Sequence, residues 1–418
     1  MNIIPPAHDA DPCGAVVSLL ADLVRRPSVN PMGREVAGPE FLERRVGSYL
    51  TQRFTAAGIA WARQTVAPGR DNVVARLDAT VNQAPAILWD AHQDTVPVDG
   101  MTIDPFAPVV RDGRLYGRGA CDVKGGMAAM VAALERLCVD PRPRRFTVFF
   151  SATVNEEFGF SGARAIARLW DRPEPSDSAA AALLATRPVA AIVAEPTELA
   201  IVTTHKGSVR WRMRVLGRSC HSSFPEHGEN AIYRSAPAIF AIEQLADELR
   251  TRFPGHPCGP PTINLGTIRG GTGVNLVPDQ VLLELERRLV PGEDPAAARD
   301  EVIGRIASRC PPHWIEHDQP FLASDGLPDH ADLPVIAGVS PAQHLADALR
   351  GCGIDPRRTA ARYGTNASVF ARASIPSVVF GPGSIEQAHT AAEWVSLGQV
   401  TKAVAVLVES IAGLPLAP

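Results

Sequence analysis

The sequence is short of the features that mark several classes of protein. Its seven cysteines are scattered and none stands in a Cys-x-x-Cys pair, which argues against a zinc ribbon and a disulfide scaffold. No apolar run is long enough to span a bilayer, and residues 1–11 lack the regions of a secretory signal. A net charge of -4 argues against a nucleic-acid surface. These absences predict a cytoplasmic protein with reduced thiols and no membrane or nucleic-acid partner.

What is present is typical of a globular protein with two domains. At 418 residues the chain exceeds the usual size of one domain, and 45% hydrophobic with 21% charged residues are ordinary values. Short apolar runs alternate with helical periodicity up to about residue 203, and the helical pattern returns after about residue 320. This alternation predicts a layered, largely parallel α/β domain formed by residues 1–203 and 321–418.

The pattern between these two segments is different. Over residues 209–215 apolar residues alternate with three arginines, which is typical of a strand in an antiparallel sheet with one solvated face. The order β-α-β-β-α follows from a helix over 231–250, strands over 262–268 and 281–289, and a helix over 296–308. Residues 204–320 are therefore predicted to form an inserted, ferredoxin-like α+β domain.

Potential metal ligands stand where apolar strands end or in glycine-rich turns. His92 and Asp94 follow the apolar run 86–89 and point the same way on an extended chain, and a carboxylate often fixes the ring of a metal-bound histidine. Alone, this pair fits a satisfied histidine at a strand end equally well. Five such positions recur along the chain: His92, Asp122, Glu157, Glu195 and His389. Five at one edge of one sheet are hard to explain as helix caps.

Two histidines and three carboxylates suit two Zn²⁺-class ions with one carboxylate bridging them. The adjacent Glu156 and Glu157 support this interpretation, because burying two neighbouring carboxylates is costly unless a cation neutralises one. Glu157 is predicted to bind metal and Glu156 to act as the general base. The glycine-rich stretch 117–126 lacks the spacing of a phosphate-binding loop.

Five segments resemble the co-catalytic zinc amidohydrolases, in order and over nearly the whole chain. They are residues 92–97, 117–126, 155–157, 195–197 and 381–393. That family includes acetylornithine deacetylase, succinyl-diaminopimelate desuccinylase, aminoacylase and carboxypeptidase G. The sequence Gly-Pro-Gly-Ser-Ile-Glu-Gln-Ala-His at 381–389 is most similar to the acetylornithine-deacetylase-like branch. The resemblance implies a zinc-hydrolase catalytic domain and an inserted dimerisation domain that acts as a lid.

The resemblance also assigns roles to residues of the candidate metal site. Its ligands would be His92 and Glu195 for one zinc, Glu157 and His389 for the other, and Asp122, beside a cis peptide bond to Val123, as the bridge. Asp94 would orient His92, and Glu156 would take a proton from water and deliver it to the leaving amine. The chain would bind two Zn²⁺, for which Co²⁺ or Mn²⁺ could substitute.

Further positions match substrate-binding positions of the family. His221 matches a lid histidine that polarises the scissile carbonyl across a homodimer, and Asn275 and Arg288 match lid positions that hold the substrate carboxylate. Gly364, Thr365 and Asn366 match a substrate loop of the catalytic domain, where acetylornithine deacetylases often carry an acidic residue in place of Asn366. Without the resemblance, His221 would be interpreted as a surface histidine and Asn275 as a turn residue. Arg288 would be one of two neighbouring arginines on a strand, of which one must face solvent.

The sequence therefore predicts a cytoplasmic, homodimeric dizinc amidohydrolase that cleaves the amide of an N-acylated amino acid or related small amine. Two other enzymes stay open, namely a metallo-carboxypeptidase or dipeptidase and a deformylase of an N-formyl aminopyrimidine. A catalytically silent binding protein with this fold is a rival from another class. Such a protein should have lost Glu156 or a ligand, and here all six residues are present.

Overall fold

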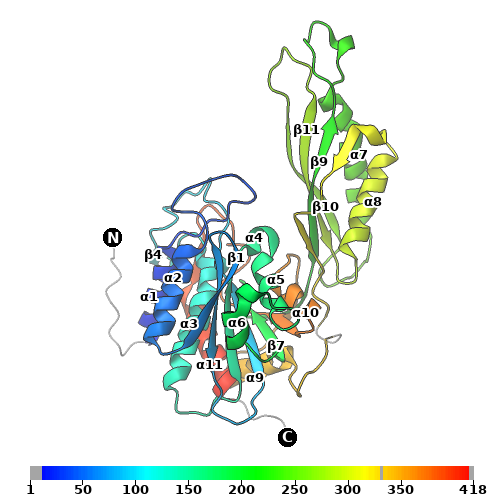
Figure 1. Ribbon diagram of the computed structural model, residues 1–418. Helices are drawn as coiled ribbons and strands as arrows, with labels where there is room; N and C mark the ends of the chain where they lie inside the picture. Colours follow the sequence, from blue (N-terminus) through cyan, green and yellow to red (C-terminus); the bar gives the residue numbers. More distant parts are fainter. Residues whose placement is uncertain (1–11, 330–332, 414–418) are drawn as a thin grey trace. The chain divides into compact units, whose positions relative to one another are not determined.

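The computed structural model describes residues 12–329 and 333–413, and these form two compact units (Figure 1). The first unit contains the described residues up to Thr203, Asp329–Thr359 and those from Thr365 onward, and the second contains Thr204–Pro328 and Ala360–Gly364. The sequence placed the return to the first unit at residue 321, whereas strand β13 (Leu322–Ser324) still belongs to the second because it pairs with β9 there. The expectation about a secretory signal concerns residues 1–11, which lie outside the described residues.

The first unit is built on an eight-stranded sheet. In spatial order its strands are β1 (Ala60–Ala67), β2 (Arg70–Leu77), β6 (Thr147–Thr153), β3 (Ala86–His92), β7 (Ala190–Val193), β15 (Ser377–Val379), β8 (Ile201–His205) and β14 (Arg358–Ala361). The four central strands, from β6 to β15, are parallel, whereas β1 pairs antiparallel with β2, β2 with β6, and β8 with β15. The sheet is therefore mixed, and the prediction of a largely parallel sheet holds only for its centre.

Helices cover both faces of this sheet, so the unit is layered as predicted. One face packs against α1 (Pro12–Val24), α2 (Arg44–Ala56), α3 (Gly125–Val139), α9 (Pro341–Gly351) and α11 (Leu397–Ala412), and the other against α5 (Ser161–Arg168), α6 (Ser178–Leu183) and α10 (Asn366–Arg372). Central strand β3 is buried along its whole length, which is why it begins with the continuous apolar run 86–89. Ile87 and Trp89 enter the main core, and Asp90 and His92 alternate with them and point to the opposite face.

The first unit also contains a small three-stranded sheet, two strands of which come just before the glycine-rich stretch 117–126. It consists of β4 (Val109–Arg111), β5 (Arg114–Tyr116) and β16 (Trp394–Ser396), in the order β16-β5-β4. Asp112 and Gly113 join β4 to β5 with φ angles of 52° and 71°, the left-handed backbone of a tight hairpin turn. This Asp-Gly hairpin leads into the single helical turn η1 (Ala120–Lys124).

The second unit has the predicted ferredoxin-like order of elements. Its strands are β9 (Gly207–Leu216), β10 (Thr262–Gly270), β11 (Gln280–Leu289), β12 (Ile315–His317) and β13, and its helices are α7 (Ala231–Leu249) and α8 (Pro295–Ala307). The sheet is antiparallel in the order β10-β11-β9-β12, with β13 also pairing with β9. Val209, Trp211, Met213 and Val215 form its core, while the arginines between them pair with carboxylates on the opposite face.

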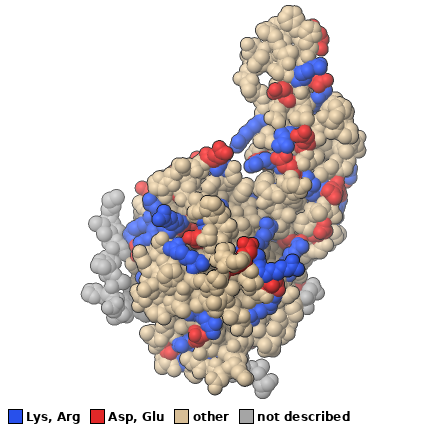
Figure 2. Space-filling view, in the orientation of Figure 1, with Lys and Arg blue, Asp and Glu red and all other residues tan. Residues whose placement is uncertain are grey.

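The surface shows charges of both signs side by side over the visible face (Figure 2). Three short 3-10 turns, η2 (Pro175–Asp177), η3 (Pro225–His227) and η4 (Pro312–Trp314), connect longer elements. Within the described residues, no helix combines the length and apolar character that a membrane-spanning segment requires.

Candidate metal centre

The carboxyl ends of three adjacent strands bring predicted ligands to one edge of the large sheet. Strand β3 ends at His92, β6 runs into Asn155 and helix α4 (Glu156–Gly159), and β7 is followed by Glu195. In the β3–β6 register His92 lies beside Thr153, so the two strands end at the same level. The crevice beyond such strand ends is where open α/β sheets place their ligands.

Asp122 lies at the centre of this edge. It belongs to η1 and precedes the cis peptide bond to Val123 that the family resemblance implied. Its Oδ1 atom lies 3.0 Å from Nε2 of His92, and its Oδ2 atom lies 3.2 Å from Nε2 of His389. The same His389 atom lies 3.4 Å from Oε2 of Glu157. One carboxylate therefore faces two histidines that come from distant parts of the chain.

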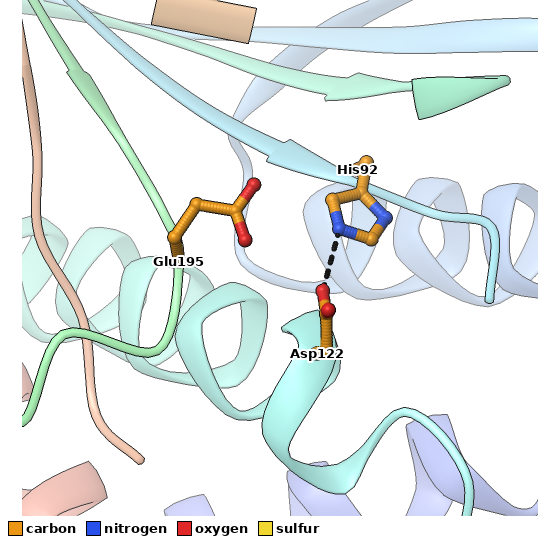
Figure 3. Close-up of side chains that lie close together, drawn as sticks. All are labelled: His92, Asp122 and Glu195. Atoms are coloured by element: carbon orange, nitrogen blue, oxygen red, sulfur yellow. Dashed lines mark hydrogen bonds and ion pairs between the residues drawn. The ribbon is translucent and has the colours of Figure 1, made fainter. Parts of the chain in front are cut away.

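Two groups of side chains can each surround a metal ion, and they share Asp122. The first is His92, Asp122 and Glu195, and the second is Asp122, Glu157 and His389; in each, the donor atoms lie within 4.8 Å of one another. Figure 3 shows His92, Asp122 and Glu195 converging from a strand end, a helical turn and a loop. All five predicted ligands are brought together, in the pairing that the family resemblance implied.

The charges at this edge need a cation to balance them. Burial and neighbouring carboxylates, Asp122 first among them, raise the pKa of Glu195 well above its ordinary value. Burial likewise raises the pKa of Glu156, with Glu157 and Asp122 adding to the effect. Within the described part of the chain, no group donates a hydrogen bond to either carboxylate of Glu156 or Glu195. Buried charges of this kind are normally paired or bound to metal.

The ring of His92 is held in the tautomer that suits a metal ligand. Its Nδ1 atom lies 2.8 Å from the backbone carbonyl oxygen of Asp94, and because a carbonyl can only accept, Nδ1 carries the proton. Burial alone would lower the pKa of His92, but its hydrogen bond to Asp122 and the charge of Glu156 raise it well above the ordinary value. A metal ion in place of a proton on Nε2 would satisfy Nε2 and the carboxylates together while Nδ1 keeps its hydrogen bond.

Asp94 acts on the site in a different way from the one the resemblance implied. Its backbone carbonyl orients His92, whereas its carboxylate lies 3.7 Å from the ring. The carboxylate instead accepts hydrogen bonds from the backbone N–H groups of Glu156 and Glu157, at 3.0 and 3.2 Å, and from the Asn30 side chain at 2.7 Å. Asp94 therefore fixes the start of α4 and the positions of both glutamates.

The donor set fits zinc-class ions. All candidate donors are imidazole nitrogens and carboxylate oxygens, which Zn²⁺, Co²⁺ and Mn²⁺ accept. Cys121, the neighbour of Asp122, is turned away from the site, because its thiol donates a hydrogen bond to the backbone carbonyl of Ser384 at 3.3 Å. Burial also raises the pKa of this thiol, so it stays protonated and is no competing ligand.

Comparison with known proteins agrees with this geometry. Residues 88–412 match the model of peptidase family M20/M25/M40. The chain belongs to that family. An acetylornithine deacetylase of Salmonella heidelberg (strain SL476) is 31% identical over 405 residues, which cover 94% of each chain. The prediction of a metal-dependent hydrolase related to acetylornithine deacetylase is confirmed at the level of the family.

Solved structures of other proteins share the fold. Human carnosine dipeptidase 1 aligns with a TM-score of 0.72 and 16% identity over 96% of this chain and 97% of that chain. The Bacillus subtilis YXEP protein, described as a dinuclear metal-binding peptidase of the M20 family, aligns with a TM-score of 0.61 and 17% identity, over 96% of this chain and 97% of that chain. At these identities the likeness shows the fold, and it confirms the predicted α/β domain with an inserted α+β domain.

In the second unit the structure brings two of the three predicted lid residues together. His221 is exposed and forms an antiparallel bridge with Leu276, and the backbone N–H of Ser222 donates to the carbonyl of Asn275 at 3.0 Å. Arg288 lies on β11, where its guanidinium pairs with Glu286 at 2.9 Å. Of the two neighbouring arginines, Arg287 is the one that is fully buried.

The predicted substrate loop uses its side chains within the protein. Thr365 caps α10 by accepting a hydrogen bond from the Ala367 N–H at 3.1 Å. The buried Asn366 donates from Nδ2 to Asp90 at 2.9 Å and to Thr153 at 3.0 Å, and its Oδ1 accepts no hydrogen bond from the described residues. Gly364 is half-buried. Oδ1 of Asn366 is thus a buried acceptor without a hydrogen-bond partner among the described residues.

A residue that the sequence reasoning did not assign holds the loop of Asp122. The buried Glu393 accepts hydrogen bonds from the backbone N–H groups of Gly119, Cys121 and Asp122, at 2.8 to 3.0 Å, and from the Arg118 guanidinium at 2.7 Å. Four donors thus converge on one carboxylate. Glu393 lies in the segment that carries the family resemblance, but no spacing rule links it to a loop more than 270 residues away.

We expect Glu393→Gln to weaken metal binding. The glutamine NH₂ group would face two of the four donors, so the Asp122 loop would lose its anchor, and loss of such supporting contacts typically lowers metal affinity by about 10–100-fold. Titration with a competing chelator measures the change. Glu386→Gln removes an exposed carboxylate from the same segment and is the matched control. Equal metal affinity in both variants would show that Glu393 does not position the loop.

Proposed function

We propose that the chain is a dizinc amidohydrolase that removes the acyl group from an N-acylated amino acid or a related small amine. The observation that carries the proposal is the carboxylate of Asp122, which faces two ligand groups at once, with Glu156 beside them on α4. Sequence identity of 31% to an acetylornithine deacetylase over 94% of the chain supports the deacylase class.

The residues around the site have separate roles in this reaction. Two zinc ions held by the five ligands would lower the pKa of a water molecule and polarise the amide carbonyl. Glu156 is not a member of either ligand group, and its raised pKa suits a group that accepts a proton from water and passes it to the leaving amine. Asp94 accepts hydrogen bonds from the backbone N–H groups of Glu156 and Glu157, so it holds each glutamate in the position that its separate role requires.

A hydrolysis screen tests the proposed class of substrate. The metal-loaded enzyme, supplied with Zn²⁺ or Co²⁺, is offered N-acetyl, N-formyl and N-succinyl amines beside dipeptides. Preferred cleavage of one N-acyl series supports the deacylase. Preferred cleavage of dipeptides would support the alternative, a metallo-carboxypeptidase or dipeptidase, which the fold of human carnosine dipeptidase 1 favours. Cleavage of N-formyl compounds alone would point to a deformylase of an aminopyrimidine.

The environment of Asn366 bears on the amine that leaves. An acidic residue at this buried position would face the carboxylate of Asp90, and two unpaired carboxylates at that distance repel. The asparagine instead donates to Asp90 and adds no negative charge at this position. We infer that the amine site is less acidic than that of enzymes with a carboxylate here, so acetylornithine is one candidate among several small N-acyl amines.

We also propose that the second unit forms a homodimer and that the enzyme is cytoplasmic. Strand β10 is an edge strand, and large apolar side chains are exposed on it and on α7, namely Ile268, Tyr233 (77% exposed) and Phe240 (62% exposed). Exposed apolar patches beside an open strand edge commonly mark an interface between chains.

The proposed cytoplasmic location is supported by the cysteines. The six cysteines that follow Cys13 in the sequence are all free thiols, as expected in a reducing compartment.

His221→Ala is expected to lower turnover by about 10²–10³-fold with both metals retained, because a donor aimed at the developing oxyanion contributes about 2.7–4 kcal/mol. His221 is exposed and its ring accepts a hydrogen bond only from the nearby Ser223 N–H, so the ring has no role in the core. Steady-state kinetics and metal analysis measure both effects. His227→Ala changes another exposed histidine of the same loop and is the control.

A mixed dimer separates action within one chain from action across the dimer. Inactive His221→Ala and Glu156→Gln subunits are allowed to exchange, which gives one whole site in each mixed dimer. If half of the dimers are mixed, about a quarter of wild-type activity should return, since twofold symmetry leaves one site in two complete. Absence of activity after exchange confirmed by mass would show that His221 acts within its own chain or has no catalytic role.

A further inference from the structure

A basic pocket in the first unit lies apart from the residues of the metal centre. Its lining residues are Arg26, Arg44, Arg45, Ser48, Tyr49 and Gln52, and its volume is about 510 Å³. Arg26 follows the end of α1, and the other five belong to the first turns of α2. The lining contains three guanidinium groups and hydrogen-bonding side chains, with no carboxylate among them.

Arg26 is held in place by contacts within the protein, whereas the side chains of Arg44 and Arg45 are available to bind a ligand. The Arg26 guanidinium donates to the Asp22 carbonyl at 2.5 Å, lies 3.7 Å from the Asp22 carboxylate and stacks 3.8 Å from the centre of the Tyr49 ring. Arg44 and Arg45 are exposed and make no hydrogen bond or ion pair from their side chains to other described residues. Arg44 and Arg45 thus carry two positive charges without a counter-ion among the described residues, and these create a potential that attracts an anion.

The start of α2 adds to this potential. No side chain caps the 13-residue helix, and no acidic residue stands in its first turn. The residue before the helix, Glu43, is turned away and pairs with Arg70 at 2.6 Å, so its charge is neutralised. The first backbone N–H groups of α2 and the helix dipole therefore favour an anion at the same end of the helix as Arg44 and Arg45.

We propose that this pocket binds a small molecule that carries a phosphate group. A phosphate monoester has a charge of about -1.5 to -2 near neutral pH and three acceptor oxygens, which match guanidinium groups bidentately. A volume of about 510 Å³ has room for the organic part of such a molecule as well as the phosphate. Gln52 supplies a neutral hydrogen-bonding group for that part, whereas the Tyr49 hydroxyl donates to Asp22 at 3.0 Å and Oγ of Ser48 accepts from Arg63 at 3.3 Å.

One residue of the pocket, Arg26, and the neighbour of another, Glu43, are hydrogen-bonded to loops of the metal centre. The backbone carbonyl of Arg26 accepts from Nζ of Lys124 at 2.8 Å, two residues after Asp122. The Glu43 carboxylate, next to Arg44, accepts from the backbone N–H of Asn155 at 3.3 Å, one residue before Glu156. A bound phosphate ester would hold Arg26 and the start of α2 in place, and through these contacts it would stabilise both loops.

Calorimetry with ribose 5-phosphate tests the proposal on the metal-loaded, full-length protein. The metal centre can itself bind phosphate, so the number of sites is compared between variants. Wild-type protein is expected to bind one more ribose 5-phosphate per chain than R44A/R45A, and R44Q/R45Q, which keeps side-chain length, should lose the same site. The control R136A/R172A removes two other exposed arginines of this unit and should bind as wild type does.

Hydrogen exchange provides the second measurement. Ribose 5-phosphate should slow amide exchange over residues 118–124 and 155–157 more in wild type and the control than in R44A/R45A. Ribose without phosphate should bind to none of the proteins. Equal stoichiometry in wild type and R44A/R45A would overturn the site, and binding of ribose or succinate in preference to ribose 5-phosphate would overturn its assignment to phosphate. Equal exchange would overturn the link to the loops.

Discussion

Replacing Glu156 with glutamine is expected to lower turnover by about 10²–10⁴-fold, the usual effect of losing a general base. The metal content should stay nearly unchanged, because Glu156 belongs to neither ligand group and glutamine has almost the same shape. The backbone N–H of residue 156 would still donate to Asp94, so the start of α4 would keep its position. Steady-state kinetics together with elemental analysis of the purified variant measures both quantities.

The neighbouring glutamate provides the matched comparison. Glu157→Gln removes one ligand oxygen from the group formed with Asp122 and His389, so it should lower metal occupancy as well as activity. Both variants change one carboxylate on the same short helix, so a general disturbance of α4 would affect them alike. Equal loss of metal from the two variants would show that the division between base and ligand is wrong.

The strand ends could be predicted from the sequence because burial leaves a clear pattern there. β3, β6 and β7 are central strands buried on both faces, so each appears as an apolar run followed by the first polar residue. Placing His92, Glu157 and Glu195 at the carboxyl ends of such strands places them at one edge of the sheet. The alternating apolar and arginine residues of β9 predicted the second sheet for the same physical reason.

Other parts of the fold leave weaker patterns. β1 was not predicted, because it lies at the edge of the sheet and its mostly exposed or half-buried residues show no clear alternation. β13 was assigned to the wrong unit, because three residues between loops carry no signal of their pairing partner. The antiparallel pairing of β1 with β2 follows from the tight turn between them, in which Gly69 has a φ of 75°.

The contacts that support the site could not be derived from residue type alone. The sequence identified Asp94 as a partner of His92, but it could not show that the carbonyl oxygen makes this contact and that the carboxylate binds α4 instead. Glu393 and Asn366 reach their partners only after distant segments have packed together. Periodicity identifies which residues are buried, whereas the choice of hydrogen-bond partner inside the protein is set by tertiary packing.

Removing the metal ions is expected to abolish activity, and this is the largest effect of all. The site gathers Asp122, Glu156, Glu157 and Glu195 around two histidines, and Glu156 and Glu195 have pKa values raised well above normal by burial. After dialysis against a chelator, elemental analysis should find almost no metal. After addition of Zn²⁺, Co²⁺ or Mn²⁺ it should find about two ions per chain, the number expected for a two-metal site, and activity should return with each of the three ions.

The number of ions at which activity returns distinguishes two sites from one. His92 and Glu195 belong to one ligand group, and Glu157 and His389 belong to the other. His389→Ala should therefore leave a single ion tightly bound in the group of His92, and His92→Ala should leave a single ion in the group of His389. The two variants thus serve as controls for each other, and each should bind about one ion per chain, half of the number expected for the intact two-metal site. The half-exposed His389 offers the easier access of the two, so we expect its group to lose metal first during chelation. Full activity in metal-free protein, or a single ion bound by the wild-type chain, would contradict the assignment of two metal ions, because Asp122 would then have no second ion to bridge.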